Sequence, residues 1–510
     1  MSTAEDKPQA RQNANLVRSF LLGPMRSIVP ALLNIALIPI IISKGGLHAV
    51  GYWGTINLIV SVFLLCDLGV SQHISRALSV RSHDSLAVRR MIEIVFSFWF
   101  VLSLGVMAVF LVFSGPVLTS LGIPLEPQSV AGLALVSIAG LCALYCGVFV
   151  FLHISVHQVP FAQVNQAAGA LVQFVCAAFL LQILHPYLAL AGAIALAYAA
   201  RTVGLYSNLR RVGFEALPSR IAFPSISSLR EIFLQSKGFA LLGASQQMFQ
   251  VANRSAILAF GGTSVLGAFE IANRVPFLLE QAFGNGLQPL FAVFAAADWQ
   301  GEEGRKRLQS LAQWVFRLLV VTSSACLAAW VALSGPVIGI WLDLARPKLI
   351  LATQLFAIYN AVRSFNAPTF WFLQARGGET ALGAIYMAQA LLLLPVLTIA
   401  AKFVEVDLLT AAIAITALSI IAELSALAVA EIRYGYVRTV ISGRTAIQPL
   451  VISAALITCA WLVAAPPTHR ANAIQIGLMP AATFLGLWVV ALLVVSGGRP
   501  DKLLRPEYLS

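Results

Sequence analysis

Long apolar runs separated by short polar segments occupy most of the chain. A helix of about 20 mostly apolar residues crosses about 30 Å of hydrocarbon, and about fourteen segments have that character. Backbone amides in a bilayer need internal hydrogen bonds, so the segments are expected to be helices, and the alternating pattern of a membrane β-barrel is absent. The predicted spans cover residues 19–42, 51–75, 91–113, 130–152, 160–183, 187–207, 232–259, 266–290, 313–333, 350–373, 380–401, 407–430, 446–465 and 474–496.

Two segments 216 residues apart carry the same glycine pattern. Residues 45–57 read GGLHAVGYWGTIN and residues 261–273 read GGTSVLGAFEIAN, while SGPV recurs at residues 114–117 and 334–337. Duplicated membrane halves are typical of transporters. The predicted fold class is therefore an all-α polytopic membrane protein with two pseudo-symmetric six-helix lobes and two extra C-terminal helices.

The longest polar interruption reads NLRRVGFEALPSRIAFPSISSLR and lies between the sixth and seventh predicted spans. Its proline, serine and arginine content is typical of a linker. Because six spans precede it, both copies enter the membrane in the same direction, which predicts lobes related by an axis along the membrane normal. The predicted domains are an N-terminal lobe (1–207), a cytoplasmic linker (208–230), a C-terminal lobe (231–432) and an appendage of two helices with a cytoplasmic tail (433–510).

Charge is scarce and unevenly placed. Only 11% of the residues are charged, and the lysines and arginines gather in alternate loops, where we count Arg201 together with Arg210 and Arg211. This bias predicts that both termini are cytoplasmic. The net charge of +12 follows from these loops and no basic, aromatic module accompanies it, so no nucleic-acid partner is expected.

The six cysteines fall in predicted spans without a CxxC pair, which predicts packing residues and no metal site.

Two consecutive predicted helices, 232–259 and 266–290, carry polar stripes. Their polar residues recur at three- and four-residue spacing, which places them on one face of each helix. We interpret the stripes as the lining of a water-filled cavity, with interhelical hydrogen bonding as the alternative. The residues are Gln246, Gln247, Gln250, Asn253 and Arg254 on the first helix, and Glu270, Asn273, Arg274, Gln281, Asn285 and Gln288 on the second.

Charged side chains inside spans are the candidate functional residues, since each costs about 2.5–3.5 kcal/mol at a helix centre. Lys237 and Arg317 lie near helix ends, where they can reach the interface. The other span cations are candidate substrate ligands, because a guanidinium binds phosphate oxygens bidentately. The candidate substrate-binding residues are Arg26, Arg254, Arg274 and Arg363, with the repeated Asn57 and Asn273.

Four acids are candidates for coupling transport to H⁺ or Na⁺: Asp67, Glu270, Glu280 and Glu423. Glu270 is expected to form an ion pair with Arg274, one turn away on the same helix. No resident cofactor and no catalytic residue is expected.

The glycine-rich turn, G-Y-W and D-L-G of GGLHAVGYWGTINLIVSVFLLCDLGVSQHISRAL resemble the opening of polysaccharide and O-antigen flippases. GGTSVLGAFEIANRVPFLLEQAFGNGLQPLFAVFA is similar to the seventh-to-eighth-helix region of the same family, which belongs to the multidrug/oligosaccharidyl-lipid/polysaccharide (MOP) superfamily. The resemblance implies a V-shaped pair of lobes whose first, second, seventh and eighth helices line a cavity. It places Arg26, Arg254 and Arg274 on those helices, and Arg363 less directly.

The resemblance further implies translocation of a polyprenyl-diphosphate-linked oligosaccharide across the bacterial inner membrane by alternating access. A glycan polymerase and a chain-length regulator are the expected protein partners. A cation-coupled multidrug exporter of the same superfamily is the first alternative. A membrane glycan polymerase or ligase is the second, with only Asp343, Arg346 and Lys348 as loop residues to support it.

Overall fold

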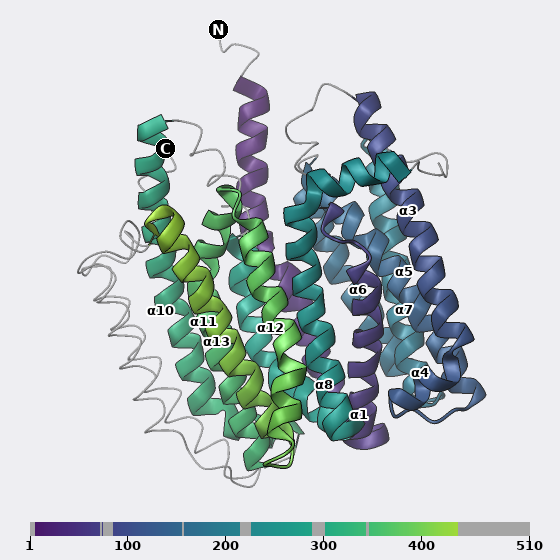
Figure 1. Cartoon of the computed structure of the whole chain (residues 1–510). Helices are drawn as coiled ribbons and strands as arrows, with labels where there is room; N and C mark the ends of the chain where they lie inside the picture. Colours follow the sequence, from purple (N-terminus) through teal and green to yellow (C-terminus); the bar gives the residue numbers. More distant parts are fainter. Residues whose placement is uncertain are drawn as a thin grey trace. The chain divides into compact units, whose positions relative to one another are not determined.

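The computed structural model describes residues 6–71, 74, 85–155, 158–214, 226–287, 301–342 and 346–436, and every regular element among them is a helix (Figure 1). Predicted spans 446–465 and 474–496 lie outside the described residues. The helices are α1 (Asp6–Leu65), α3 (Ser85–Val112), α4 (Ser114–Ser120), α5 (Pro127–Ser155), α6 (Val159–Leu180), α7 (Pro186–Arg211), α8 (Ile226–Leu287), α10 (Gly301–Leu342), α11 (Pro347–Ala375), α12 (Glu379–Ala400) and α13 (Leu408–Tyr434).

Nine helical stretches of the described chain are long and apolar enough to cross a membrane. Two of them, Ile28–Leu65 and Lys237–Leu278, have 38 and 42 residues. At 1.5 Å per residue each is about twice as long as the hydrocarbon core is thick. Each contains two predicted spans joined at a repeated glycine. The prediction of an all-α, multi-pass membrane protein is confirmed for this part of the chain.

By compactness the chain divides into two units. Unit 1 comprises Met1–Glu270 and Tyr386–Thr398, and unit 2 comprises Ile271–Ile385 and Ile399–Ser510. The lobe boundaries at residues 207 and 231 stay predictions.

Unit 1 has a core where α3, α5 and α7 meet. Trp99, Leu152 and Leu205 are completely buried there, because each helix turns one apolar face toward the other two. The Thr202 hydroxyl donates to the carbonyl of Cys142 at 3.0 Å and so ties α7 to α5. Helix α6 packs beside α7 and α1, and its opposite stripe exposes large apolar side chains, as expected of a surface that meets lipid.

Unit 2 is organised around α11. The Trp330 indole on α10 donates to the Thr353 hydroxyl at 3.0 Å, and that hydroxyl donates to the Ala272 carbonyl on α8 at 2.6 Å. One threonine thereby links three helices. At the start of α13, the side chain of Asp407 accepts a hydrogen bond from the Thr410 amide at 3.0 Å and caps the helix.

Candidate functional site

The repeated glycines form two equivalent helix breaks. Gly46 has φ 62° and ψ −155°, and Gly262 has φ 70° and ψ −174°, while the helices continue on both sides. This backbone region is essentially restricted to glycine. The sequence repeat therefore encodes the same chain reversal twice, once in α1 and once in α8.

The two repeats also pack on each other reciprocally within unit 1. A Cβ added to Gly51 would overlap the carbonyl of Thr263, and one added to Gly267 would overlap the carbonyl of Leu47. Gly51 corresponds to Gly267 in the repeat, and Leu47 corresponds to Thr263. Two equivalent surfaces that contact one another in this way are self-complementary, as in a two-fold interface. His48 adds a hydrogen bond of 2.8 Å between its Nδ1 and the Thr263 hydroxyl.

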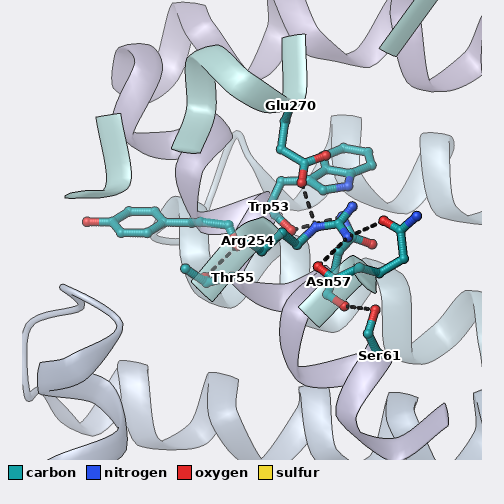
Figure 2. Close-up of polar contacts among 8 residues, drawn as sticks. Trp53, Thr55, Asn57, Ser61, Arg254 and Glu270 are labelled. Atoms are coloured by element: carbon teal, nitrogen blue, oxygen red, sulfur yellow. Dashed lines mark hydrogen bonds and ion pairs between the residues drawn. The ribbon is translucent and has the colours of Figure 1, made fainter. Parts of the chain in front are cut away.

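The symmetry is broken three residues further along, where Gly54 in the first repeat corresponds to Glu270 in the second. A Cβ at Gly54 would lie 2.7 Å from Cγ of Leu266 and 3.2 Å from Cγ of Glu270, so the missing side chain leaves room for both the leucine and the glutamate. Glu270 accepts a hydrogen bond from Nε of Arg254 at 2.7 Å, and the two side chains are only 8% and 12% exposed (Figure 2). The position equivalent to Arg254 in the first repeat is the buried Ile38. The ion pair therefore exists in one repeat only.

Arg254 is held from a second direction by Gln250, one turn earlier on α8. Its Nη1 donates to Oε1 of Gln250 at 2.8 Å and more weakly to the Gln250 carbonyl at 3.4 Å. The expectation that Glu270 pairs with Arg274 is wrong, because the glutamate reaches across to Arg254 on the preceding part of α8. The glycine break at Gly262 bends the chain back and brings these two positions together.

Asn57 and Asn273 occupy equivalent positions but differ in their contacts. Asn57 donates to the carbonyl of Trp53 at 2.9 Å on its own helix, and its own carbonyl accepts from Ser61 at 2.8 Å (Figure 2). Oδ1 of Asn273 is buried without a hydrogen-bond partner. Only Asn273 therefore offers a buried, unused acceptor.

Unit 2 holds a second arginine–carboxylate pair. Nε of Arg363 lies 3.2 Å from Oε1 of Glu280, and its Nη1 donates to the Tyr359 hydroxyl at 2.9 Å. The second carboxylate oxygen of Glu280 is buried without a hydrogen bond. Arg363, predicted as a substrate ligand, and Glu280, predicted as a coupling acid, are therefore ion-pair partners.

The remaining candidates are placed as follows. Glu423 is buried and accepts a hydrogen bond of 2.6 Å from Asn366, a residue that the sequence analysis did not single out. Asp67 accepts from the Ser71 hydroxyl at 2.6 Å. Arg274 is half-buried on α8, whereas the side chain of Arg26 lies outside the described part.

The outer-loop residues on which the polymerase or ligase alternative rests are only partly described. Lys348 forms an exposed ion pair of 2.6 Å with Asp407, and Asp343 lies outside the described residues. Within the described chain no group of three or more His, Cys, Asp or Glu side chains is placed to hold a metal ion. The site chemistry therefore consists of buried guanidinium–carboxylate pairs and amides, which can bind an oxyanion or exchange a proton.

No protein-family model matches the chain, and no curated protein matches it. Solved structures do match. An inward-facing multidrug resistance MATE family transporter of the MOP superfamily is 16% identical, with 82% of this chain and 100% of that chain covered and a TM-score of 0.63. An outward-facing one is 17% identical, with 84% and 97% covered and a TM-score of 0.61.

A further match is a MOP superfamily transporter from Pyrococcus furiosus, whose binding pocket is described as having reverse polarity that suggests a different function. It is 16% identical, with 84% of this chain and 97% of that chain covered and a TM-score of 0.59. At this level of identity the likeness establishes architecture rather than activity. The chain has the fold of MATE family transporters of the MOP superfamily.

Proposed function

We propose that the protein is a flippase that moves a polyprenyl-diphosphate-linked oligosaccharide from the cytoplasmic to the periplasmic leaflet of a bacterial inner membrane by alternating access. The observation that carries the proposal is the half-satisfied guanidinium of Arg254 inside an apolar unit. Its Nε and Nη1 are bonded by Glu270 and Gln250, whereas Nη2 makes no hydrogen bond to a described residue. A diphosphate offers the oxygens that this free edge can bind.

The carboxylate of Glu270 sets the strength of that interaction. While Glu270 is ionised it competes with an anionic head group for Arg254, because both present oxygens to one guanidinium. Such competition can contribute to a transport cycle only if the two conformations differ in their affinity for the head group.

The same reasoning extends the proposal to unit 2. Arg363 and Glu280 form a comparable pair, and the unused carboxylate oxygen of Glu280 is placed to accept a proton or to coordinate Na⁺. Asp67 and Glu423 stay candidates for ion coupling. Arg274 and Asn273 stay candidate head-group ligands, and the expected glycan polymerase and chain-length regulator stay proposed partners.

Two features of the related structures support transport by this fold. They are described in inward-facing and outward-facing conformations, as alternating access requires. The Pyrococcus furiosus transporter, with its binding pocket of reverse polarity, supports the view that this fold accommodates pockets of different charge.

The test is surface glycan export in a strain that lacks the gene, complemented with variants at matched membrane levels. Arg254→Ala should abolish export, Arg254→Lys should retain a small part of it, and Glu270→Gln should change the export rate, because it removes the carboxylate that competes with the head group. Arg433→Ala, which removes an exposed arginine from the last turn of α13, is the control and should export normally. Normal export by Arg254→Ala would overturn the proposal.

The second candidate is a cation-coupled multidrug exporter. It is favoured by the multidrug resistance transporters among the related structures and by the buried acids Glu280 and Glu423. The deletion strain separates the two, because loss of an exporter raises drug sensitivity and leaves surface glycan intact.

A further inference from the structure

Arg201 lies inside a membrane span, although its sequence context placed it among loop cations. Helix α7 runs from Pro186 to Arg211, and the whole stretch is long and apolar enough to cross a membrane. Arg201 precedes the end of the helix by ten residues, which corresponds to about 15 Å along the axis. Counting Arg201 among the loop cations is therefore wrong, because it lies inside α7 and inside the predicted span 187–207.

The side chain of Arg201 runs toward the start of α7. Its guanidinium carbon lies over the ring of Tyr198, 5.1 Å from the centroid, and Tyr198 is three residues earlier. Helical Cα–Cβ bonds tilt in the same direction. The guanidinium thus points away from the nearer helix end, and does not reach the interface there as a snorkelling arginine would.

Helices α6 and α7 make room for this arginine and for an asparagine beside it. A Cβ at Gly169 on α6 would overlap Cγ and Cδ of Arg201, and a Cβ at Gly204 on α7 would overlap Nδ2 of Asn165. Each helix therefore contributes one polar side chain and one glycine that receives the partner's side chain. Such close approach is what glycine permits between membrane helices.

These two polar groups are only partly satisfied by the described protein, in which the guanidinium of Arg201 contacts Tyr198. Arg201 forms no ion pair with any described carboxylate, and its Nε is buried without a hydrogen bond. Oδ1 of Asn165 is likewise buried without a partner. Native structures rarely leave such groups unpaired, and inside a membrane segment an uncompensated charge usually marks a function.

We propose that Arg201 and Asn165 form a binding subsite for a phosphate group where α6 and α7 pack together. The guanidinium supplies a planar set of donors for the phosphate oxygens, and Oδ1 of Asn165 accepts a hydrogen bond from a P–OH or a neighbouring hydroxyl. The ligand class is a phosphate that carries a hydroxyl, either free in solution or in the head group of an anionic lipid. The subsite uses none of the residues of the Arg254 site, so it stands or falls independently of the flippase proposal.

The test uses the full-length protein in a neutral maltoside detergent, with Arg201→Met, Arg201→Lys and Asn165→Ala. The probes are inorganic phosphate in a thermal-unfolding assay at constant ionic strength, and phosphatidylglycerol retention measured by native mass spectrometry. Arg210→Met is the matched control, because it removes the exposed arginine that lies over Tyr206 on the same helix.

Wild type and Arg210→Met should bind one of the probes at least about tenfold more tightly than Arg201→Met, since a charge-assisted contact is lost. Arg201→Lys should lie between them, and Asn165→Ala should also weaken binding. Without ligand, Arg201→Met should melt at or above the wild-type temperature, because it removes a charge that no described carboxylate neutralises. Stabilisation by inorganic phosphate identifies a soluble ligand, and retention of phosphatidylglycerol alone identifies a lipid head group. Equal binding of both probes by Arg201→Met and Arg210→Met would overturn the proposal, as would a lower melting temperature of Arg201→Met without any ligand effect.

Discussion

Replacing Glu270 with leucine should destabilise the protein by about 3 kcal/mol, the lower end of the range for breaking a buried ion pair. The side chain keeps its volume beside Gly54, so the main effect is that Arg254 loses the partner of its Nε. The exposures of 12% and 8% argue for the lower end, because some water reaches both groups. Arg254→Met should cost a similar amount, since it leaves the glutamate unpaired.

The double variant Arg254→Met, Glu270→Leu should be close to wild type in stability. Removing both charges also removes both desolvation costs, and hydrophobic residues of similar size commonly replace such a pair without loss. Because each single variant costs about 3 kcal/mol and the double variant almost nothing, the coupling energy of the cycle should be about 6 kcal/mol in magnitude. That is far above the roughly 0.5 kcal/mol within which independent effects usually add.

The assay is equilibrium unfolding in mixed micelles of lipid and denaturing detergent, followed by tryptophan fluorescence. The matched control is the more exposed pair of Arg89 and Glu93 on α3, 3.2 Å apart at i,i+4 spacing, with side chains 41% and 20% exposed. Its cycle should give about 0.3–0.5 kcal/mol. If the effects of the Arg254 and Glu270 variants simply add, the pair contributes no mutual stabilisation and the reasoning from its burial is refuted.

Three further substitutions test the frame around this pair. Gly262→Ala should lower the free energy of unfolding by about 1–3 kcal/mol through its positive φ alone, since nothing lies near the added Cβ. Gly105→Ala on α3 is the control and should be neutral or stabilising. Equal effects of the two substitutions would contradict this account. Gly51→Ala should cost about 1–3 kcal/mol by pressing on a backbone carbonyl, and a melting temperature equal to that of wild type would count against the reciprocal packing. Asp407→Ala should cost about 1 kcal/mol by removing the cap of α13. Desolvation raises the pKa of Asp407, but hydrogen bonds from Lys348 and Thr410 outweigh it and lower the pKa below its ordinary value. The contribution of Asp407 is therefore present above pH 4 and lost below it, so the cost of Asp407→Ala should shrink in acid, as unfolding curves at pH 7 and pH 3 would show.

Apolar length and the glycine repeat predicted the helical fold, because both are local properties of the chain. The sequences of residues 45–57 and 261–273 match directly, and the equivalent Gly46 and Gly262 do adopt the same backbone conformation. Partner choice could not be predicted in the same way. Glu270 was assigned to Arg274 by helical spacing, yet a helix break eight residues earlier turned the chain and presented Arg254 instead. Arg201 was counted with the loop cations because Arg210 and Arg211 follow it, although the predicted span 187–207 already contained it and both later arginines belong to the same helix.

The repeat explains why charge is confined to one copy at this position. Two equivalent surfaces that pack reciprocally bring each position close to its own counterpart, as Gly51 and Gly267 show. A glutamate in both copies would therefore place two like charges near each other, and the single guanidinium of Arg254 could not offset their repulsion. Glycine at position 54 avoids that conflict and supplies the space in which one carboxylate meets one guanidinium. A Gly54→Ala variant should accordingly impair export more than it impairs folding. The added Cβ presses on the side chains of Leu266 and Glu270 and so shifts the carboxylate from Arg254, while an alanine in a helix is otherwise favourable. Export at the wild-type level with normal protein abundance would show that the position of this carboxylate does not matter for transport.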